Sequence, residues 1–154
     1  MIKYLWLAFV GGLIFMLGAC ATKQIYAPVQ PQRIYEQIAA RKLYPLLEEI
    51  FIREGFTIAS RDYARGYLST NWYEYEGQRH GFVKWRERRK YEVLFDLDRL
   101  SGKHMLILTL YVEERAPVST DWRDKEVDSA SDEQFQRILR ELDDAVKAKG
   151  GKLV

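Results

Sequence analysis

Residues 83–114, VKWRERRKYEVLFDLDRLSGKHMLILTLYVEE, carry the pattern that decides the fold of this chain. Over residues 83–98, apolar and charged side chains alternate with the period of two that is typical of a strand with one buried face. Ser101-Gly102-Lys103 predicts a hairpin turn, and residues 104–114 alternate again, with leucine at 106, 108 and 110. Two long antiparallel strands therefore form the centre of the predicted sheet.

The two faces of the first long strand differ in their chemistry. Its apolar face, interrupted by Glu87 and Arg89, consists of Val83, Trp85, Tyr91, Val93, Phe95 and Leu97. The opposite face carries a basic stripe, about 20 Å long at roughly 3.3 Å per residue, which consists of Lys84, Arg86, Arg88 and Lys90. Such a stripe is suited to bind phosphate or carboxylate oxyanions. Alternatively, Glu74 and Glu76 on the preceding strand neutralise it across the hairpin.

Two shorter strands are predicted before the long ones, at residues 56–61 and 67–76, with turns at 62–66 and 77–81. The alternation directs Leu68, Thr70 and Trp72 towards the core. It directs a candidate aromatic interaction surface outward, consisting of Tyr67, Tyr73 and Tyr75, with Tyr111 and Trp122 from later segments. Tyrosines are enriched in protein interfaces, but they also occur on strands through β-propensity alone, so both interpretations remain open.

An amphipathic helix is predicted on each side of these strands. From Arg33, apolar residues recur at spacings of three and four, with Pro45 predicting a kink near Tyr44 or two short helices, and Gly55 ending the segment. The second helix begins with a capping box, in which Ser131 is the N-cap and Gln134 follows three residues later, and it ends at 150–151. The predicted fold is α+β: a two-layer domain whose four-stranded antiparallel sheet carries an N-terminal and a C-terminal helix on one face.

The N-terminal segment predicts export. Lys3 precedes a charge-free apolar run over residues 4–16, which has the length of a signal sequence and is shorter than the roughly 20 residues of a membrane-spanning helix. Leu17-Gly18-Ala19-Cys20 follows and resembles the lipobox of bacterial lipoprotein precursors, in which the signal peptidase recognises the three residues before the cysteine. The resemblance implies cleavage before Cys20 and a covalent diacylglycerol and N-acyl lipid on that residue. Ala21, in place of an aspartate, resembles the outer-membrane sorting pattern.

The chain is thus predicted to have three parts: a signal peptide at 1–19, a lipidated extended tether at 20–32, and a single α+β domain at 33–154. A tether containing Pro28 and Pro31 favours extended conformations and reaches roughly 35 to 40 Å. With 24 basic and 22 acidic residues, the charge gives no support to nucleic-acid binding. We expect localisation on the periplasmic face of the outer membrane, with the membrane and a protein of an envelope complex as partners.

The order of these elements resembles the helix-grip domains of BamC-type lipoproteins. The residues that carry the resemblance, besides the lipobox, are Gly55-Phe56-Thr57-Ile58 and Gly66-Tyr67-Leu68-Ser69-Thr70-Asn71-Trp72. Members of that family are non-catalytic accessories of the outer-membrane β-barrel assembly machine. They typically have two such domains and a long N-terminal segment, whereas this sequence predicts one domain on a short tether. The resemblance therefore implies a fold and a general role, but not a particular partner.

No common catalytic motif occurs in the sequence, and the two histidines, His80 and His104, are predicted in or beside turns. Asp96 and Asp98 lack a third predicted ligand, so no metal site and no catalytic residue is predicted. The favoured hypothesis is a non-enzymatic scaffold or adaptor lipoprotein of the cell envelope. The alternative hypothesis is an envelope lipoprotein that binds a lipid or a glycan.

Overall fold

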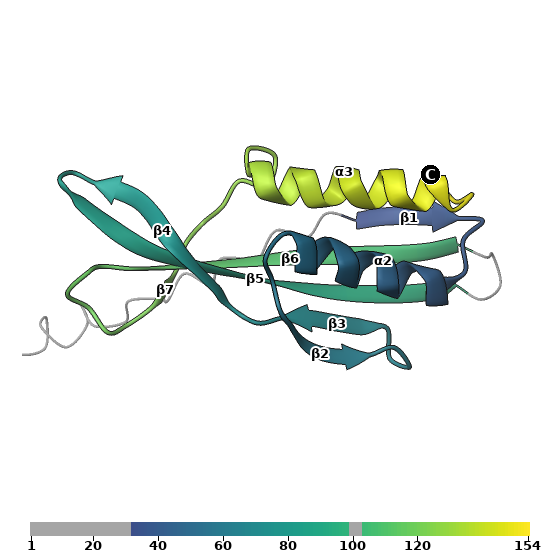
Figure 1. The fold of residues 1–154 in the computed structure, drawn as a ribbon, viewed down its shortest axis with the longest axis horizontal. Coiled ribbons are helices and arrows are strands. Elements are labelled where there is room, and N and C mark those ends of the chain that lie inside the picture. Colours follow the sequence, from purple (N-terminus) through teal and green to yellow (C-terminus); the bar gives the residue numbers. More distant parts are fainter. Residues whose placement is uncertain (1–31, 99–102) are drawn as a thin grey trace, which may run out of the picture.

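The computed structural model describes residues 32–98 and 103–154, which form one antiparallel sheet and two helices (Figure 1). The helices are α2 (Ala40–Arg53) and α3 (Glu133–Ala148). The strands are β1 (Gln32–Glu36), β2 (Ile58–Asp62), β3 (Tyr67–Thr70), β4 (Tyr73–His80), β5 (Val83–Asp98), β6 (Lys103–Arg115), β7 (Arg123–Asp124) and β8 (Lys152–Leu153). The sheet has the order β2-β3-β5-β6-β1-β8, and β4 and β7 pair with the outer ends of β5 and β6. The predicted α+β class is confirmed.

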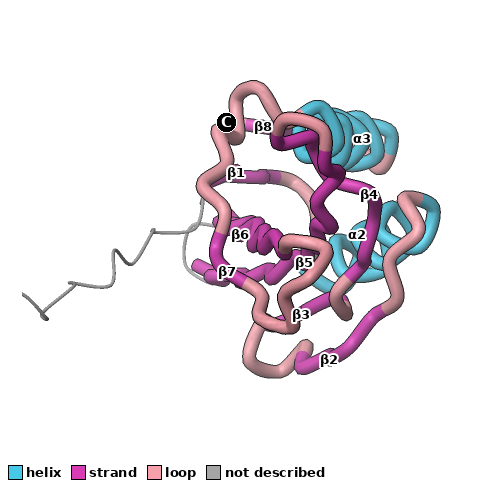
Figure 2. Tube along the Cα trace, turned by 90° about the vertical axis from the view of Figure 1, so that its left-hand side faces the viewer, coloured by secondary structure: helices cyan, strands magenta, loops and turns pink. Residues whose placement is uncertain are grey.

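The core lies between the two helices and one face of the sheet. Alternate residues of β5 and β6 face the helices, as the period of two predicted, and both helices lie on the same side of the sheet (Figure 2). The fully buried residues from these four elements include Leu47 and Phe51 of α2, Tyr91 and Val93 of β5, Leu106 and Leu108 of β6, and Phe135, Ile138 and Leu142 of α3. Their burial from water is the main force that holds the two layers together.

The sheet is larger than the four strands that the sequence predicts. The strands β7 and β8 have two residues each, which is too short to produce a periodic pattern, so they were missed. The predicted strand over residues 67–76 is two strands, β3 and β4, separated by Asn71 and Trp72. The strand β4 also runs through the predicted turn at 77–81, so the turn contains only Gly81 and Phe82.

The first predicted helix begins later than expected, because residues 32–36 form strand β1 between β6 and β8. Within β1, Tyr35 is fully buried and donates a hydrogen bond of 2.7 Å from its hydroxyl to Asp143 of α3. Gln37, with φ of 61°, then turns the chain towards α2. Of the two alternatives predicted at Pro45, the pair of short helices is wrong, because α2 is one helix that includes this residue. Burial of its apolar face outweighs the loss of one backbone hydrogen bond at proline.

An extra residue between β3 and β4 reverses which side chains face the core. Ser69 pairs with Glu92 of β5, and Tyr73 pairs with Arg89 of β5. Ser69 and Tyr73 are four residues apart in the sequence, whereas their partners in β5 are only three residues apart. A single extra residue moves all following side chains to the opposite face of a sheet. As a result, Trp72 lies on the face away from the helices, while Tyr73 and Tyr75 lie on the helix side, contrary to the prediction for all three.

The second helix follows the prediction closely, except at its first residue. Asp132, and not Ser131, is the N-cap, and its carboxylate accepts a hydrogen bond of 2.8 Å from the backbone N–H of Phe135. Gln134, predicted to complete the capping box, instead bonds to Arg89 and Glu54. The helix ends at Ala148, before Gly150, whose φ of +84° favours glycine.

A substitution at Gly66 tests whether the backbone at the start of β3 must lie in close contact with β5. A Cβ atom at this residue would lie 2.4 Å from the backbone oxygen of Phe95, and its φ is +72°. We expect Gly66→Ala to lower the free energy of unfolding by about 3 kcal/mol, because the backbone must shift as well as adopt a strained conformation. Gly150→Ala is the matched control, since its φ is also positive but its Cβ would meet open space. Urea unfolding that gave equal losses for both variants would contradict the proposed steric contact.

Candidate functional site

The sheet extends beyond the two helices as a twisted arm (Figure 1). We use "the arm" for β4, residues 83–90 of β5, residues 111–115 of β6, and β7. We call the face that continues the helix side the inner face, and the opposite one the open face. The residues predicted to form an interaction surface lie on both of these faces, and not on one surface as predicted.

The basic stripe lies on the open face, as the alternation predicted, but every member has a carboxylate partner. The ion pairs, with their N···O distances, are Lys84–Glu76 (2.5 Å), Arg86–Glu74 (3.8 Å), Arg88–Glu113 (2.5 Å) and Lys90–Glu92 (2.9 Å). The neutralisation by Glu74 and Glu76 that the sequence left open is therefore present. Exposed pairs such as those of Lys84 and Arg86 contribute little to stability. The stripe consequently offers ordered polar groups more than net positive charge.

Aromatic rings contact the same cations and form an aromatic–cation cluster on the open face. The guanidinium of Arg88 lies 4.6 Å from the ring centroid of Trp72 and 4.4 Å from that of Trp122. The guanidinium of Arg115 lies 4.6 Å from Trp122, and the ammonium of Lys90 lies 4.7 Å from Tyr111. Cation–π contacts of this geometry hold long side chains in place. Burial, and a hydrogen bond to Glu92, raise the pKa of Tyr111 to about 12, so its hydroxyl stays a donor.

The three predicted tyrosines do not form one surface. Tyr67 pairs with Leu94 and lies on the open face, where Leu94 is 48% exposed. Tyr73 and Tyr75 are opposite Arg89 and Glu87 on the inner face, with their rings stacked at a centroid distance of 6.5 Å. Both were predicted to point outward, and the extra residue after β3 is the reason for the error.

Glu87 is the centre of the inner face of the arm. It is 4% exposed, and its carboxylate accepts hydrogen bonds from Lys125 Nζ (2.7 Å), the backbone N–H of Gln78 (2.8 Å) and the hydroxyl of Tyr75 (3.0 Å). Gly77 makes room for it, because a Cβ at that residue would lie 2.3 Å from Glu87 Cγ. Burial alone would raise the pKa of Glu87, but these three donors outweigh it and hold the pKa below the ordinary value of 4.5.

Arg89 connects this cluster to the start of α3. It donates to the Tyr75 hydroxyl (2.7 Å), to Gln134 Oε1 (2.8 Å) and to the Asp132 carboxylate (3.3 Å), which also caps the helix. Burial raises the pKa of Tyr75 to about 12, so this hydroxyl remains able to donate to Glu87. A continuous chain of polar contacts thus runs from Lys125 through Glu87, Tyr75 and Arg89 to the helix.

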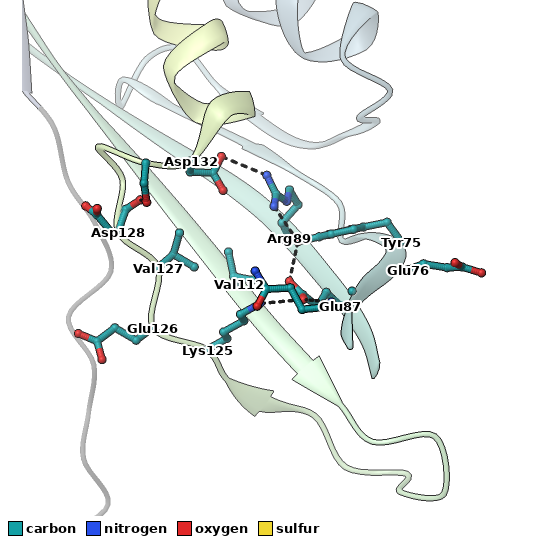
Figure 3. A pocket seen from close by; sticks show the side chains of 13 residues that line it. Tyr75, Glu76, Glu87, Arg89, Val112, Lys125, Glu126, Val127, Asp128 and Asp132 are labelled. Carbon is teal, nitrogen blue, oxygen red and sulfur yellow. Dashed lines mark hydrogen bonds and ion pairs between the residues drawn. The ribbon is translucent and has the colours of Figure 1, made fainter. Parts of the chain in front are cut away.

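These side chains line a cavity of about 500 Å³, which we call the arm cavity (Figure 3). One wall consists of Tyr75, Glu87 and Arg89, and the other is the segment from Lys125 to Asp132 that leads into α3. Most of the charged groups at its base already bond to one another. The cavity is therefore polar and partly closed by its own ion pairs.

Neither His80 nor His104 lines the arm cavity. His80 lies at the end of β4, with its Nε2 3.5 Å from Glu114 Oε2, and its ring is 4.4 Å from that of Trp85. Arg123 holds the same carboxylate at 2.7 Å, so Glu114 is already engaged in an ion pair. His104 lies in β6 beside β1, where it pairs with Tyr35. Within residues 32–98 and 103–154, no three His, Cys, Asp or Glu side chains are grouped to hold a metal ion.

Sequence reasoning missed several residues that belong to the clusters on the two faces of the arm: Trp72, Glu113, Arg115, Lys125 and Asp132. It also missed Glu87 and Arg89 as the centre of the inner-face cluster. A signal for the last two was present, because both interrupt an otherwise apolar strand face. Two charges at core-facing positions indicate that the helices do not cover that part of the strand. The predicted lipidation residue Cys20 and the recognition residues Leu17, Gly18 and Ala19 lie outside the described residues.

Comparisons with known proteins identify no family. No protein-family model and no curated protein matches the chain. Among solved structures, the chain is similar to a DUF4468 family protein from Bacteroides ovatus, at 9% sequence identity, a TM-score of 0.40 and coverage of 84% of each chain.

Glu87→Gln tests the inner-face cluster. We expect this variant to lose about 2 kcal/mol of unfolding free energy at neutral pH, because the Lys125 ammonium loses its buried charged partner. The folded-state pKa of Glu87 is lowered, so its contribution is present above pH 4.5 and disappears as the pH falls through the lowered value. The difference from the natural chain should therefore shrink in acid.

Glu126→Gln is the control for this experiment, because Glu126 lines the same cavity but is exposed (Figure 3). Denaturant unfolding of the three proteins across acid and neutral pH measures the effect. A loss for Glu87→Gln that did not change with pH would contradict the role of the ionised carboxylate.

Proposed function

We propose that this protein is a non-enzymatic, lipid-anchored scaffold or adaptor of the cell envelope, on the periplasmic face of the outer membrane. In this proposal, Cys20 anchors the chain after cleavage of a signal peptide, and the single α+β domain binds a protein of an envelope complex. Barrel assembly is the complex that the sequence resemblance favours. The two helices on one face of a long antiparallel sheet are compatible with a variant of the helix-grip fold.

The observation that carries the adaptor proposal is the aromatic–cation cluster on the open face. Trp72, Trp122 and Arg88 are of the residue types that contribute most to protein interfaces. Their mutual contacts, at 4.4 to 4.6 Å, order them before any partner arrives. Binding then costs less side-chain entropy than it would for free side chains. No element within residues 32–98 and 103–154 lies over this face of the sheet in the way that the helices cover the other (Figure 2).

Further support comes from what the described residues offer for chemistry. The histidine nearest to a carboxylate, His80, is 45% exposed and shares Glu114 with Arg123. General acid–base catalysis needs an organised partner within hydrogen-bond reach of a substrate. No helix within the described ranges is long and apolar enough to cross a membrane. Attachment to the membrane is therefore assigned in this proposal to Cys20.

The arm cavity favours a second candidate function, glycan binding. Its polar lining suits sugar hydroxyls better than a lipid chain, and Tyr75 and Arg89 are side chain types that bind sugars. Native mass spectrometry of the protein mixed with soluble peptidoglycan fragments tests this candidate. A stable adduct that Arg89→Met abolishes would support it, and the absence of any adduct would count against it.

Replacement of the predicted anchor tests membrane attachment. We expect Cys20→Ser to abolish incorporation of radiolabelled palmitate and to leave the precursor uncleaved, because the lipid bond requires the thiol. Two or more acyl chains give stable anchoring, since each buried CH₂ contributes about 0.8 kcal/mol. Palmitate incorporation and electrophoretic mobility are the measurements. Labelling that persisted in Cys20→Ser would refute the anchor.

Trp122→Ala tests the docking surface. Affinity purification of the intact lipoprotein from membranes in mild detergent should recover a partner protein, and the variant should bind it about 30-fold more weakly, as expected for a hot-spot residue worth about 2 kcal/mol. Tyr63→Ala is the control, because Tyr63 is an exposed ring in the β2–β3 turn, away from the arm. Recovery of a lone monomer, or equal binding by both variants, would contradict the adaptor proposal.

A further inference from the structure

The arm ends in three exposed apolar side chains that the fold does not use. Phe82, in the β4–β5 turn, is 105% exposed, and Val118, after β6, is 98% exposed. Val83, beside Phe82, is 48% exposed. Both turns project from the same end of the molecule, beyond the last β5–β6 pair at Arg86 and Arg115 (Figure 1). We call these three residues the apolar tips.

Basic and indole groups follow directly behind the apolar tips. Residues 79–86, RHGFVKWR, contain three cations and no carboxylate. Trp85 lies in β5, further from the β4–β5 turn than Val83. The guanidinium of Arg123 lies 4.2 Å from its ring centroid. The ion pairs of Lys84 and Arg86 with Glu76 and Glu74 are half-exposed, so phosphate oxygens can compete for both cations. We call Arg79, Lys84, Trp85, Arg86, Arg115 and Arg123 the basic belt.

This order of groups, with apolar tips first and a basic belt behind them, matches the order of layers at a membrane surface. Apolar side chains enter the boundary of the acyl chains, roughly 5 to 10 Å deep, while cations and tryptophan remain at the headgroups. Separate tips on two turns do not form the packed apolar patch that is typical of protein interfaces. The cations match the charge of anionic lipids.

The direction of β1 places Gln32, the first described residue, at the end of this strand nearer the arm. Gln32 pairs with Ile107 and Glu36 pairs with Lys103, so β1 begins at its end nearer the arm. From Ile107 to Arg115 is eight residues along β6, or about 26 Å, and Val118 lies in the turn that follows. The twelve residues from Ala21 to Gln32 reach roughly 37 Å when extended. A tether of this length is therefore long enough for Cys20 to reach the plane of the apolar tips.

We propose that the apolar tips and the basic belt form a second membrane contact, which inserts Phe82, Val83 and Val118 into a lipid surface containing anionic headgroups. The proposal rests on the proposed anchoring at Cys20 for its orientation, but the contact itself is made by residues of the arm. With both contacts formed, the long axis of the domain stands away from the membrane. The helices are then the part furthest from it, and the open face is turned sideways, accessible to a neighbouring protein.

Site-directed fluorescence tests this contact on the full lipidated protein. An environment-sensitive thiol dye is attached to Phe82→Cys, Val118→Cys or Val154→Cys, and the protein is reconstituted into phosphatidylethanolamine–phosphatidylglycerol vesicles. Val154 is the matched control for Val118, because it is an exposed valine that bonds to Ile34 at the opposite end of the sheet. The lipid on Cys20 would block the only natural thiol, and mass spectrometry counts the labels.

The proposal expects blue-shifted emission and several-fold stronger quenching by nitroxide-labelled lipid at residues 82 and 118 than at residue 154. It also expects weaker quenching at both tips in phosphatidylcholine vesicles, which lack anionic lipid. Equal quenching at residues 118 and 154 would overturn the proposal, even if the protein remained anchored. A shift seen in native membranes but not in lipid vesicles would also overturn it, in favour of a protein partner for the tips.

The number of dye labels per chain distinguishes a protein that lacks the lipid on Cys20 from one whose apolar tips do not enter the membrane. A second label at Cys20 would refute lipidation, and the difference between Val118→Cys and Val154→Cys would still report whether the tip enters added vesicles. Phe82→Asp combined with Val118→Asp provides a further test, because neither side chain packs against the fold. In this double variant, the same dye attached at Val83→Cys should be quenched several-fold more weakly by nitroxide-labelled lipid, and unchanged quenching would overturn the proposal.

Discussion

The continuous ladder between β5 and β6 is the constraint on which the rest of the structure depends. It runs without a shift of register from Arg86 and Arg115 to Asp98 and Lys103. Because side chains alternate strictly along such a ladder, its register fixes which residues face the helices over the whole length. The helices cover only the half that contains Tyr91 and Leu108. The other half becomes an arm, whose inner face must be stabilised by something other than a helix.

Paired charges take the place of helix cover on that inner face. A buried carboxylate without partners would be strongly destabilising, whereas Glu87 has three donors within 3.0 Å. The donor from Lys125 also holds the segment that leads to α3, and Arg89 reaches the N-cap of that helix. The arm is therefore connected to the helical layer through polar contacts. This connection keeps the arm in a defined orientation, which both a docking surface and a tip contact require.

The sequence predicts the features that have a period and misses those that depend on a single residue. The long strands, the core face of β5 and the second helix all follow from repeated alternation or helical spacing. The strand β1 was mistaken for helix because Ile34 and Ile38 also match a helical spacing, and only pairing with β6 decides between the two. At the candidate site, alternation placed the basic stripe correctly. It failed for Tyr73 and Tyr75, because no local signal marks the extra residue before them.

That extra residue also explains how one aromatic-rich segment supplies two surfaces. Without it, Trp72 would face the core side and the two tyrosines would face outward. With it, Trp72 lies against Arg88 on the open face. Tyr75 lies on the inner face, where its hydroxyl donates to Glu87 and accepts from Arg89. Arg88 and Lys90, the cations beside these rings, are already paired with Glu113 and Glu92, so this part of the open face has little charge left to attract a partner from a distance. Its recognition must instead depend on the shape and fixed positions of its rings, and those positions are set by the arm that the inner-face charges hold in place.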